Sequence, residues 1–319
     1  MKAIVYTAYG NTDVLELKEI SKPVPADDEV LVKVHAVSIN DWDIALMNGD
    51  FVNRMLNGFA KPKRTILGSD IAGVVEACGK KVSKFKIGDE VYGDLSGRWG
   101  GFAEWVCAQE KMLEHKPPVM SFVDAAAIPQ AAMLAVQGLI DVGRIKSGQK
   151  VLINGAGGGV GTFGVQLAKQ FDVEITGVDL GSKLEMLSKI GFDYVLDYTK
   201  TDFTNTGQQY DLILDVKTNR PVFDYARALN SGGTYATVGG SISRLLQTLI
   251  VGGAIRLFSG KRMSIVSLKP NKDLAYCNEL YTAGKFKPII DGPFQLEDFQ
   301  SAIGLFVRGE HKGKVVITI

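Results

Sequence analysis

Apolar residues in the first third of the chain occur in short runs, and clusters of Gly, Pro, Asp and Asn separate these runs. Runs rich in β-branched and aromatic residues, bounded by turn residues, are typical of β-strands. We predict such strands at residues 2–6, 30–37, 71–77, 90–91 and 102–107. Short strands joined by long loops favour an antiparallel, barrel-like domain in this part of the chain.

The pattern changes near Ser121, where compact apolar strands begin to alternate with segments of helical periodicity. We predict strands at 151–154, 173–179, 194–197, 212–216 and 234–238, and helices at 160–171, 183–190 and 222–229. Strict alternation of strand and helix implies a parallel sheet with helices on both faces. The final run, KVVITI, is expected to be a strand that returns to the first domain.

The predicted helix at 183–190 carries capping signals. Ser182 and Glu185 have the spacing of a capping box, and Gly191 stands where a helix often ends in a left-handed residue. We therefore expect this helix to begin just after Ser182 and the preceding strand to end at Asp179.

Composition and charge exclude several classes of protein. Of the 319 residues, 46% are hydrophobic and 22% are charged, which is ordinary for a globular protein and unlike a disordered or collagen-like chain. The formal net charge is +1, without the basic excess of a protein that binds nucleic acid. A chain of this length is expected to form one large or two ordinary domains.

The cysteines and the apolar stretches bear on the location of the protein. Cys78, Cys107 and Cys277 lie far apart, which favours buried reduced thiols over disulfides. The apolar stretches at 125–140 and 245–258 are interrupted by Pro, Gln, Gly or Arg, so neither is expected to span a membrane. We predict a soluble, cytoplasmic protein without membrane or nucleic-acid partners.

The glycine-rich segment after the strand at 151–154 predicts a dinucleotide site. A pyrophosphate needs backbone N–H groups without side chains in the way, at the N-terminus of a helix. The residues that provide this setting are Gly155, Ala156, Gly158, Gly159, Val160 and Gly161. In strict register the fingerprint is Ala-x-Gly-x-x-Gly, with Ala156 in the place of the usual first glycine.

Asp179 is the candidate ribose ligand. It follows Gly161 by 18 residues, at the end of the next predicted strand, where an acid binds the ribose hydroxyls. Such an acid repels a 2′-phosphate and so favours NADH. A surface acid in a turn is the other interpretation of Asp179, and Lys183 is close enough in sequence to offset a phosphate charge.

Motifs along the whole chain resemble the medium-chain dehydrogenase/reductase family, in its zinc-independent, quinone oxidoreductase-like branch. The matching motifs are SINDWD at 38–43, LGSDIAGVV at 67–75, GDEVY at 88–92, GFAEW at 101–105, the glycine-rich segment at 153–169, VLDY at 195–198, VGG at 238–240, KPN at 269–271 and GKVVI at 313–317. The resemblance implies an α/β fold: a Rossmann-type, doubly wound parallel sheet at 123–267, inserted into a GroES-like, partly open β-barrel catalytic domain at 1–122 and 268–319.

The resemblance also bears on metal binding. Asn40 stands where zinc-dependent members carry the first cysteine ligand, and Ser69 stands where they carry the histidine ligand. None of His35, His115 and His311 is spaced with a cysteine as a metal site requires. We therefore expect no metal.

The same resemblance names candidates for the acceptor and cofactor sites. At the acceptor site, Asn40 would orient a substrate oxygen, with Ser69 and Asp70 beside it. Asp70 would act either as a hydrogen-bond hub or as a proton relay. Trp99 would be either a mobile cover of the site or an anchor of its loop. The candidates for the cofactor are Tyr198 near the adenosine, Val216 at the loop that ends the strand at 212–216, Val238, Gly239 and Gly240 near the nicotinamide ribose, Lys269 and Asn271 toward the nicotinamide, and Lys314, whose alternative is an ordinary strand-edge lysine.

These features predict an NAD(P)H-dependent reductase that transfers a hydride from the nicotinamide C4 to a quinone or an α,β-unsaturated carbonyl compound. Such acceptors are electron-poor and need positioning more than metal activation. Family members that use NADPH commonly carry Ser-Thr and then Lys or Arg after the second strand, and the hydroxyl pair is missing here. Asp179 thus favours NADH where the family favours NADPH.

Two other functions stay open from the sequence. One is a ketone or enoyl-thioester reductase of the same family, and the other is a non-catalytic NAD(P)H-binding sensor. A homodimer that pairs through residues 264–266 is a further prediction.

Overall fold

The structure, a computed structural model, describes residues 1–319 and divides them into two units. Unit 1 comprises Met1–Gln130, Pro270–Ala283 and Ile290–Ile319, and unit 2 comprises Ala131–Lys269 and Gly284–Ile289. The first boundary therefore lies at residue 130 rather than at the predicted 122. The reason is that α3, which begins at residue 122, packs against five strands of unit 1.

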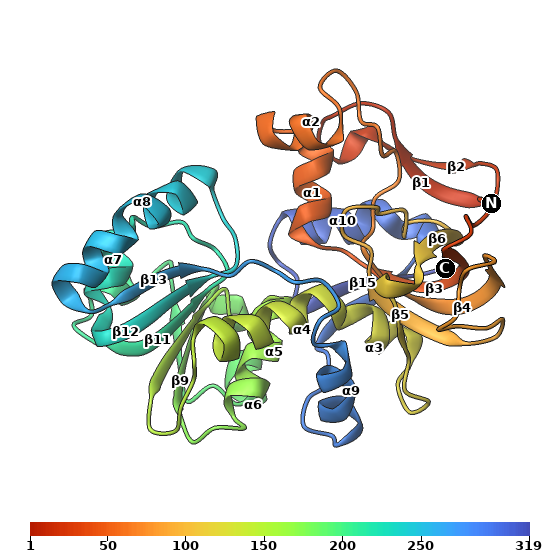
Figure 1. The fold of residues 1–319 in the computed structure, drawn as a ribbon. Helices are drawn as coiled ribbons and strands as arrows, with labels where there is room; N and C mark the ends of the chain where they lie inside the picture. Colours follow the sequence, from red (N-terminus) through yellow and green to blue (C-terminus); the bar gives the residue numbers. More distant parts are fainter. The chain divides into compact units, whose positions relative to one another are not determined.

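Unit 1 is built on a seven-stranded sheet in which the strands follow the order β14-β15-β3-β4-β5-β7, with β6 paired to β3 and with β1 and β2 as a separate pair. Its strands are β1 (Lys2–Tyr6), β2 (Leu15–Glu19), β3 (Glu29–Ser38), β4 (Asp70–Cys78), β5 (Glu90–Asp94), β6 (Trp105–Gln109), β7 (Glu114–His115), β14 (Ile290–Gln295) and β15 (Lys314–Thr318). β15 pairs antiparallel with β3, which confirms that the last strand returns to the first domain (Figure 1). The helices of unit 1 are α1 (Asp41–Asn48), α2 (Phe51–Asn57), α3 (Phe122–Ala127), α9 (Leu274–Thr282) and α10 (Phe299–Val307).

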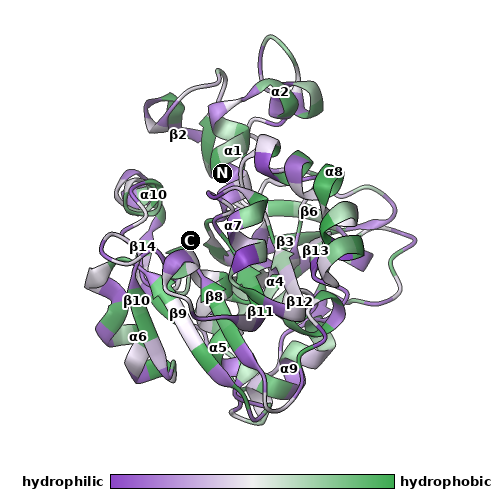
Figure 2. Ribbon diagram, turned by 90° about the vertical axis from the view of Figure 1, so that its left-hand side faces the viewer, coloured by the Kyte–Doolittle hydropathy of each residue, from purple (hydrophilic) through white to green (hydrophobic).

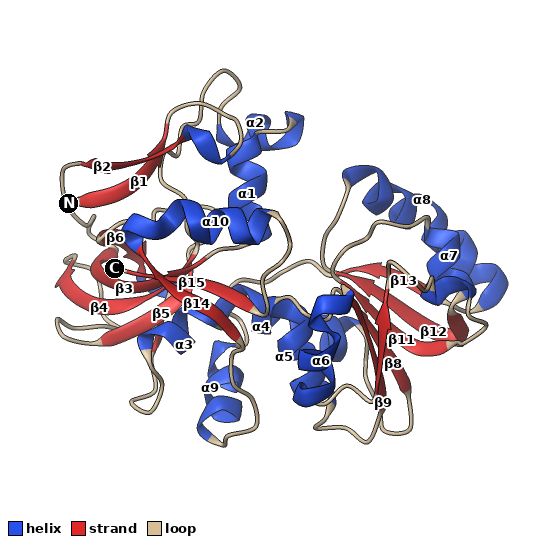
Figure 3. Cartoon of the chain, turned by 180° about the vertical axis from the view of Figure 1, so that it is seen from behind, coloured by secondary structure: helices blue, strands red, loops and turns tan.

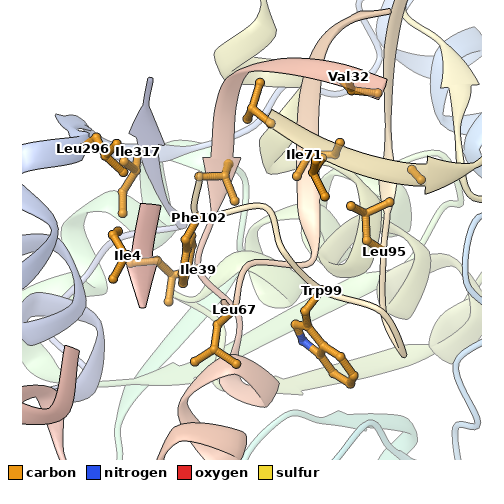
Figure 4. Packing of buried hydrophobic residues seen from close by; sticks show 14 of the residues in the cluster. Ile4, Val32, Ile39, Leu67, Ile71, Leu95, Trp99, Phe102, Leu296 and Ile317 are labelled. Carbon is orange, nitrogen blue, oxygen red and sulfur yellow. The ribbon is translucent and has the colours of Figure 1, made fainter. Parts of the chain in front are cut away.

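The core of unit 1 joins segments that are far apart in the sequence. Ile4, Ile71, Phe102 and Ile317 belong to one apolar cluster (Figure 4), and none of them is more than 1% exposed. Burying four such side chains stabilises the fold by several kcal/mol, roughly 1.5–3 kcal/mol each. The core thereby fixes the ends of β3, β4 and β15, which carry the polar residues described below.

Unit 2 contains a six-stranded, fully parallel sheet in the order β10-β9-β8-β11-β12-β13. Its elements are α4 (Pro129–Val136, which begins at the unit boundary), β8 (Lys150–Asn154), α5 (Gly159–Ala168), β9 (Glu174–Asp179), α6 (Leu184–Ile190), β10 (Tyr194–Asp197), β11 (Tyr210–Asp215), α7 (Val222–Arg227), β12 (Leu229–Thr237), α8 (Ile242–Ser259) and β13 (Arg262–Ile265). α5 and α6 cover one face of the sheet, and α7 and α8 cover the other (Figure 3). The strand order reverses between β8 and β11, and ligands of such sheets bind at the loops that follow the two strands at this point.

The helix after β9 begins differently from the prediction. Gly181–Lys183 forms a single 3₁₀ turn, closed by the Lys183 N–H donating to the Leu180 carbonyl, and α6 starts at Leu184 without a side-chain cap. The prediction of a capping box formed by Ser182 and Glu185 is therefore wrong, because Ser182 lies inside the turn. Gly191 does end the helix in the left-handed conformation, with φ of 112°.

The pattern of hydrophobic and polar residues did not predict α8 as a helix. By length and composition alone it could cross a membrane, with a mean hydropathy of 1.2 over 18 residues. Two residues of the helix, Thr248 and Gly252, are buried, and a Cβ on Gly252 would lie 3.2 Å from Met263 of β13. The helix is thus packed along an edge of the sheet through its small residues.

Candidate active site

The glycine-rich loop of unit 2 joins β8 to the N-terminus of α5, as the sequence predicts. Gly155 has φ of 85°, a conformation that strains other residues, and a Cβ on Gly161 would lie 2.4 Å from the Ala156 carbonyl oxygen. The loop therefore requires glycine at both positions. The first N–H groups of α5, from Gly159 to Gly161, have no acceptor within the helix and suit an anion.

Asp179 lies against this loop at the end of β9. Its Oδ2 accepts a hydrogen bond from the Gly157 N–H at 2.7 Å, and its Oδ1 accepts one from the Leu180 N–H at 2.8 Å. The Nζ atom of Lys183 lies 3.5 Å from Oδ1 of Asp179. The Lys183 side chain is 4% exposed and that of Asp179 is 7% exposed. The carboxylate is consequently fixed in orientation, and the nearest cation is already paired with it.

The loop after β11 meets the glycine-rich loop. A Cβ on Gly155 would lie 3.1 Å from Val216 Cβ and 3.3 Å from Lys217 Cγ, so the predicted residue Val216 does lie at the reversal of the strand order. Asp215 holds this loop, because its Oδ1 accepts from the N–H groups of Lys217 and Thr218 at 3.0 and 3.1 Å. Asp215 was not predicted from the sequence, although an acid at the end of an apolar strand was a usable signal.

The remaining cofactor candidates of unit 2 lie at ends of strands. Val238, Gly239 and Gly240 follow β12, and the Gly239 carbonyl accepts a hydrogen bond from Thr237 Oγ1 at 2.9 Å. Tyr198 follows β10, with its N–H donating to the Asp179 carbonyl at 3.2 Å and its side chain 46% exposed. The backbone of Lys269 is held by the Gln137 side chain. Direct cofactor contacts of these residues stay predictions.

In unit 1, Asn40, Ser69 and Lys314 come together as one buried polar group. Lys314 Nζ donates to Asn40 Oδ1 at 2.6 Å and to the Ile39 carbonyl at 3.2 Å, and Asn40 Nδ2 donates to Ser69 Oγ at 3.1 Å. An ammonium group has only donors, so its contact fixes which end of the Asn40 amide carries oxygen. The Asn40 side chain is also a hydrogen-bond partner of Asp70, which opposes the rise in the pKa of that carboxyl. Lys314 thus lies beside Asn40, and its predicted contact with the cofactor stays a prediction.

Asp70 and Asp94 face each other across this group. They are directly opposite on the antiparallel strands β4 and β5, which puts both side chains on one face of the sheet, and both are 0% exposed. Asp70 Oδ2 lies 3.4 Å from Lys314 Nζ and accepts the Gln130 N–H, whereas Asp94 Oδ1 accepts the N–H of Ser96. Asp70 Oδ1 and Asp94 Oδ2 have no hydrogen-bond partner.

Burial sets the protonation of these acids. It raises the pKa of Asp94 to about 7, with the nearby Asp70 charge adding to the effect. It also raises the pKa of Asp70, against the opposing effect of the Lys314 charge. The group thus contains more carboxyls than cations and holds protons near neutral pH. Asp94 was missed in the sequence, where only its place at the end of an apolar strand marked it.

Asp43 supports the backbone around Asn40. It is fully buried, and it accepts hydrogen bonds from the N–H groups of Asn40 and Gly68, each at 2.9 Å. Burial raises the pKa of Asp43 to about 7. The carboxyl therefore ties the start of α1 to the residue before Ser69, which sets the distance between Asn40 and Ser69.

Trp99 and Asn271 have structural contacts in unit 1. Trp99 has φ of 59° and is 5% exposed, and its ring packs edge-on against Trp42 at 5.4 Å between centroids. This burial in the apolar core (Figure 4) favours the loop-anchor interpretation over the mobile cover. The Asn271 side chain accepts from the Asp94 N–H at 2.8 Å and donates to the Asp94 carbonyl at 2.9 Å, so it holds the end of β5.

The residues of unit 2 fit a dinucleotide. The loop offers backbone N–H groups where side chains would collide, and a fixed acid lies beside it at the end of the next strand. These are the features that bind a pyrophosphate and a ribose. In unit 1, the Asn40 amide and the Ser69 hydroxyl are bonded to each other, and neither is a preferred zinc ligand.

The raised pKa of Asp94 predicts a pH-dependent stability. Between about pH 4 and pH 7 the folded protein keeps a proton on Asp94 that the unfolded chain has lost, so the free energy of unfolding falls as pH rises through this window. Asp94→Asn removes this contribution. Relative to the unchanged protein, we expect the variant to gain stability from pH 5 to pH 8, by at most roughly 3 kcal/mol. Urea unfolding at the two pH values measures the difference, and parallel changes in both proteins would contradict the protonation of Asp94.

Two family models match the chain: the alcohol dehydrogenase GroES-like domain over residues 26–118 and the zinc-binding dehydrogenase over residues 190–317. The chain is similar to the chloroplastic quinone-oxidoreductase homolog of Spinacia oleracea, with 32% identity over 99% of this chain and 98% of that protein. It is also similar to the chloroplastic NADPH-dependent alkenal/one oxidoreductase of Arabidopsis thaliana, with 31% identity over 99% of this chain and 79% of that protein. Among solved structures, the quinone oxidoreductase of Coxiella burnetii has a TM-score of 0.87 and 28% identity, covering 100% of this chain and 99% of that one.

These likenesses extend over both units. They confirm the predicted fold class, a GroES-like domain joined to a doubly wound parallel sheet that binds dinucleotides. Identity above 30% over nearly the whole chain is sufficient to assign the family. The chain therefore belongs to the medium-chain dehydrogenase/reductase family, in its quinone oxidoreductase-like branch.

Proposed function

We propose that the protein is a zinc-independent reductase that uses NADH to reduce a quinone or an α,β-unsaturated carbonyl compound. The observation that carries the proposal is the Asn40 amide, whose orientation is fixed by Lys314 and Ser69. In this proposal its Nδ2 group is the donor for an acceptor oxygen that gains negative charge. The names of the relatives, a quinone oxidoreductase and an alkenal/one oxidoreductase, support this class of acceptor.

The chemistry requires a hydride and a proton. A nicotinamide cofactor, when bound, supplies the hydride. The chain's own residues then stabilise the charge that develops on the acceptor oxygen, and a fixed donor in a water-poor site does this without reorganisation. Lys314 and Asp70 position Asn40. The acceptors are electron-poor enough for this polarisation to suffice without a Lewis acid.

The preference for NADH rests on Asp179. Backbone N–H groups of Gly157 and Leu180 hold its carboxylate in place, and Lys183 is already paired with it. A ribose with two free hydroxyls can donate hydrogen bonds to this carboxylate. A 2′-phosphate brought to the same place would meet a fixed negative charge whose cation is occupied.

We expect the protein, treated with a chelator, to oxidise NADH in the presence of a simple 1,4-quinone, measured as loss of reduced-nicotinamide absorbance. Asp179→Ser should lower the ratio of kcat/KM for NADH to that for NADPH by about tenfold or more, the equivalent of one lost charged interaction. Asp197→Asn is the matched control, because Asp197 lies opposite Asp179 on the neighbouring strand β10.

The outcomes of this assay separate the hypotheses. Turnover with a preference for NADPH would remove the role given to Asp179 and keep the reductase. Turnover abolished by the chelator would overturn the zinc-independent mechanism. Tight cofactor binding without oxidation by quinones, enones, ketones or enoyl-thioesters would support the sensor hypothesis. Cytoplasmic localisation stays a prediction from the sequence.

The donor role of Asn40 has its own test. Asn40→Asp keeps the size of the side chain and its contact with Lys314 but removes both N–H donors. We expect this variant and Asn40→Ala to lose about a hundredfold in kcat/KM for the acceptor, the loss typical of one oxyanion donor. NADH affinity, followed by fluorescence, should change less than about twofold. Full activity of Asn40→Asp would exclude the amide N–H as the donor.

We also infer that two copies of the chain pair along β13. This strand is the last in the sheet of unit 2, so one of its edges has no strand partner. Beside it, α8 turns large apolar residues outward, and Leu249, Ile250 and Leu257 are 66%, 78% and 80% exposed. An open strand edge next to an apolar helix suits an isologous interface.

Light scattering at micromolar concentration should therefore give twice the mass of one chain. The double variant Leu249→Glu/Ile250→Glu should shift the protein to the monomer, because it places charges on the apolar surface beside β13. A monomer in the unchanged protein would exclude this interface.

A further inference from the structure

α2 buries polar residues and exposes apolar ones, which is the reverse of the usual surface helix. The residues that it buries are amides: Asn53 is 8% exposed and Asn57 is 0% exposed. Asn57 Nδ2 donates to the Tyr6 hydroxyl at 2.8 Å, and Asn57 Oδ1 accepts the Arg64 N–H at 3.0 Å. A surface helix normally directs apolar residues inward and polar residues outward. Here the polar contacts attach the helix to unit 1.

The opposite side of α2 is apolar and open. We call it the α2 face, and its residues, with their exposed fractions, are Phe51 (67%), Val52 (41%), Met55 (67%), Leu56 (60%) and Phe59 (65%). Phe51 and Phe59 contact each other edge to face, with 6.1 Å between ring centroids, so the patch is continuous from the helix into the loop after it. Figure 2 shows apolar segments along this helix. Contiguous exposed apolar residues of this kind mark a binding surface.

The α2 face lies in a mainly basic part of the chain, in which the exposed Asp50, the N-cap of α2, is the acid next to the face. From Phe51 to Ser69 the chain has no Asp or Glu, and it carries Arg54, Lys61, Lys63 and Arg64. The guanidinium groups of Arg54 and Arg64 lie over the rings of Tyr9 and Trp99. Lys61 and Lys63 are exposed, and neither forms an ion pair. The two lysines are therefore available to an anionic partner.

We propose that the α2 face, with Lys61 and Lys63, docks on the surface of an anionic lipid bilayer. Phe, Met and Leu beside Lys and Arg, with few acids, is the composition of segments that lie in the headgroup region of membranes. With seven residues the helix is too short to span a bilayer, so the docking is peripheral. This surface revises the expectation of no membrane partner. The inference does not rest on the proposed activity, because docking needs neither cofactor nor acceptor.

The test is co-sedimentation of the full chain with extruded vesicles, either of phosphatidylcholine alone or with about a third phosphatidylglycerol. We expect binding to the anionic vesicles and weaker binding to the neutral ones. Met55→Ser/Leu56→Ser should lower the affinity for anionic vesicles by about tenfold or more, because two apolar side chains are lost. Lys61→Gln/Lys63→Gln should lower it by about fivefold per residue and remove most of its salt dependence.

Ile87→Ser and Val119→Ser are the matched controls, since both residues are 69% exposed outside the α2 face. Each control should bind the vesicles like the unchanged protein. Absence of binding to anionic vesicles, or equal binding by the Met55/Leu56 variant, would overturn the proposal. So would a change from dimer to monomer in that variant, because the face would then contact a second copy. A loss of activity toward a water-soluble quinone with unchanged vesicle binding would instead assign the face to the acceptor site and overturn the docking.

Discussion

The contact of Lys314 with Asp70 and Asn40 holds the polar part of unit 1 together. An ammonium group buried this deeply is tolerated only where oxygens replace its water, and Lys314 has the Ile39 carbonyl, Asn40 Oδ1 and Asp70 Oδ2 around it. These three oxygens come from the turn before α1 and from β4, whereas the lysine comes from the last strand. One cation thus connects the beginning, the middle and the end of the unit. Its three contacts decide the orientation of an uncharged amide, which is the group that meets a substrate in the proposed reaction.

The two units use a lysine and an aspartate in different ways. In unit 2, Asp179 and Lys183 balance each other, and backbone N–H groups complete the hydrogen bonding of the acid. In unit 1, Lys314 stands against Asp70, while Asp94 lies opposite Asp70 without a cation of its own. The first arrangement fixes the orientation of an acid toward a ligand. The second keeps a carboxyl protonated and so limits the net charge that the interior has to hold.

The sequence predicted most of unit 2 because its chemistry is local. The glycine-rich loop, Asp179 and Val216 each follow directly from a strand, and the parallel sheet brings the ends of its strands together without further information. The start of α6 was predicted wrongly. There the Leu180 carbonyl closes a turn that the side-chain pattern of Ser182 and Glu185 does not reveal. Local hydrogen bonding of the main chain overrode the capping signal.

The polar group of unit 1 was harder to predict because its members are distant in the sequence. Asn40 and Ser69 were recognised through motifs, yet nothing in the sequence places Lys314 against them or Asp94 opposite Asp70. Those contacts depend on the pairing of β15 with β3 and of β4 with β5, which is set by the packing of the whole sheet. The outward apolar side of α2 was likewise hidden, since an apolar residue in a short helix is ordinarily assigned to the core.

The division of unit 1 into three separate stretches of chain has a consequence for how the protein is made. The ribosome releases residues 131–269 of unit 2 before β15 exists, so the parallel sheet can assemble while the barrel still lacks its final strand. During that interval Asp70 has no lysine to pair with, and the interior of the barrel cannot close around it. Unit 1 is therefore completed only after the parallel sheet has been synthesised, and a nascent chain that stalls before residue 314 carries the sheet of unit 2 without the lysine that pairs with Asp70.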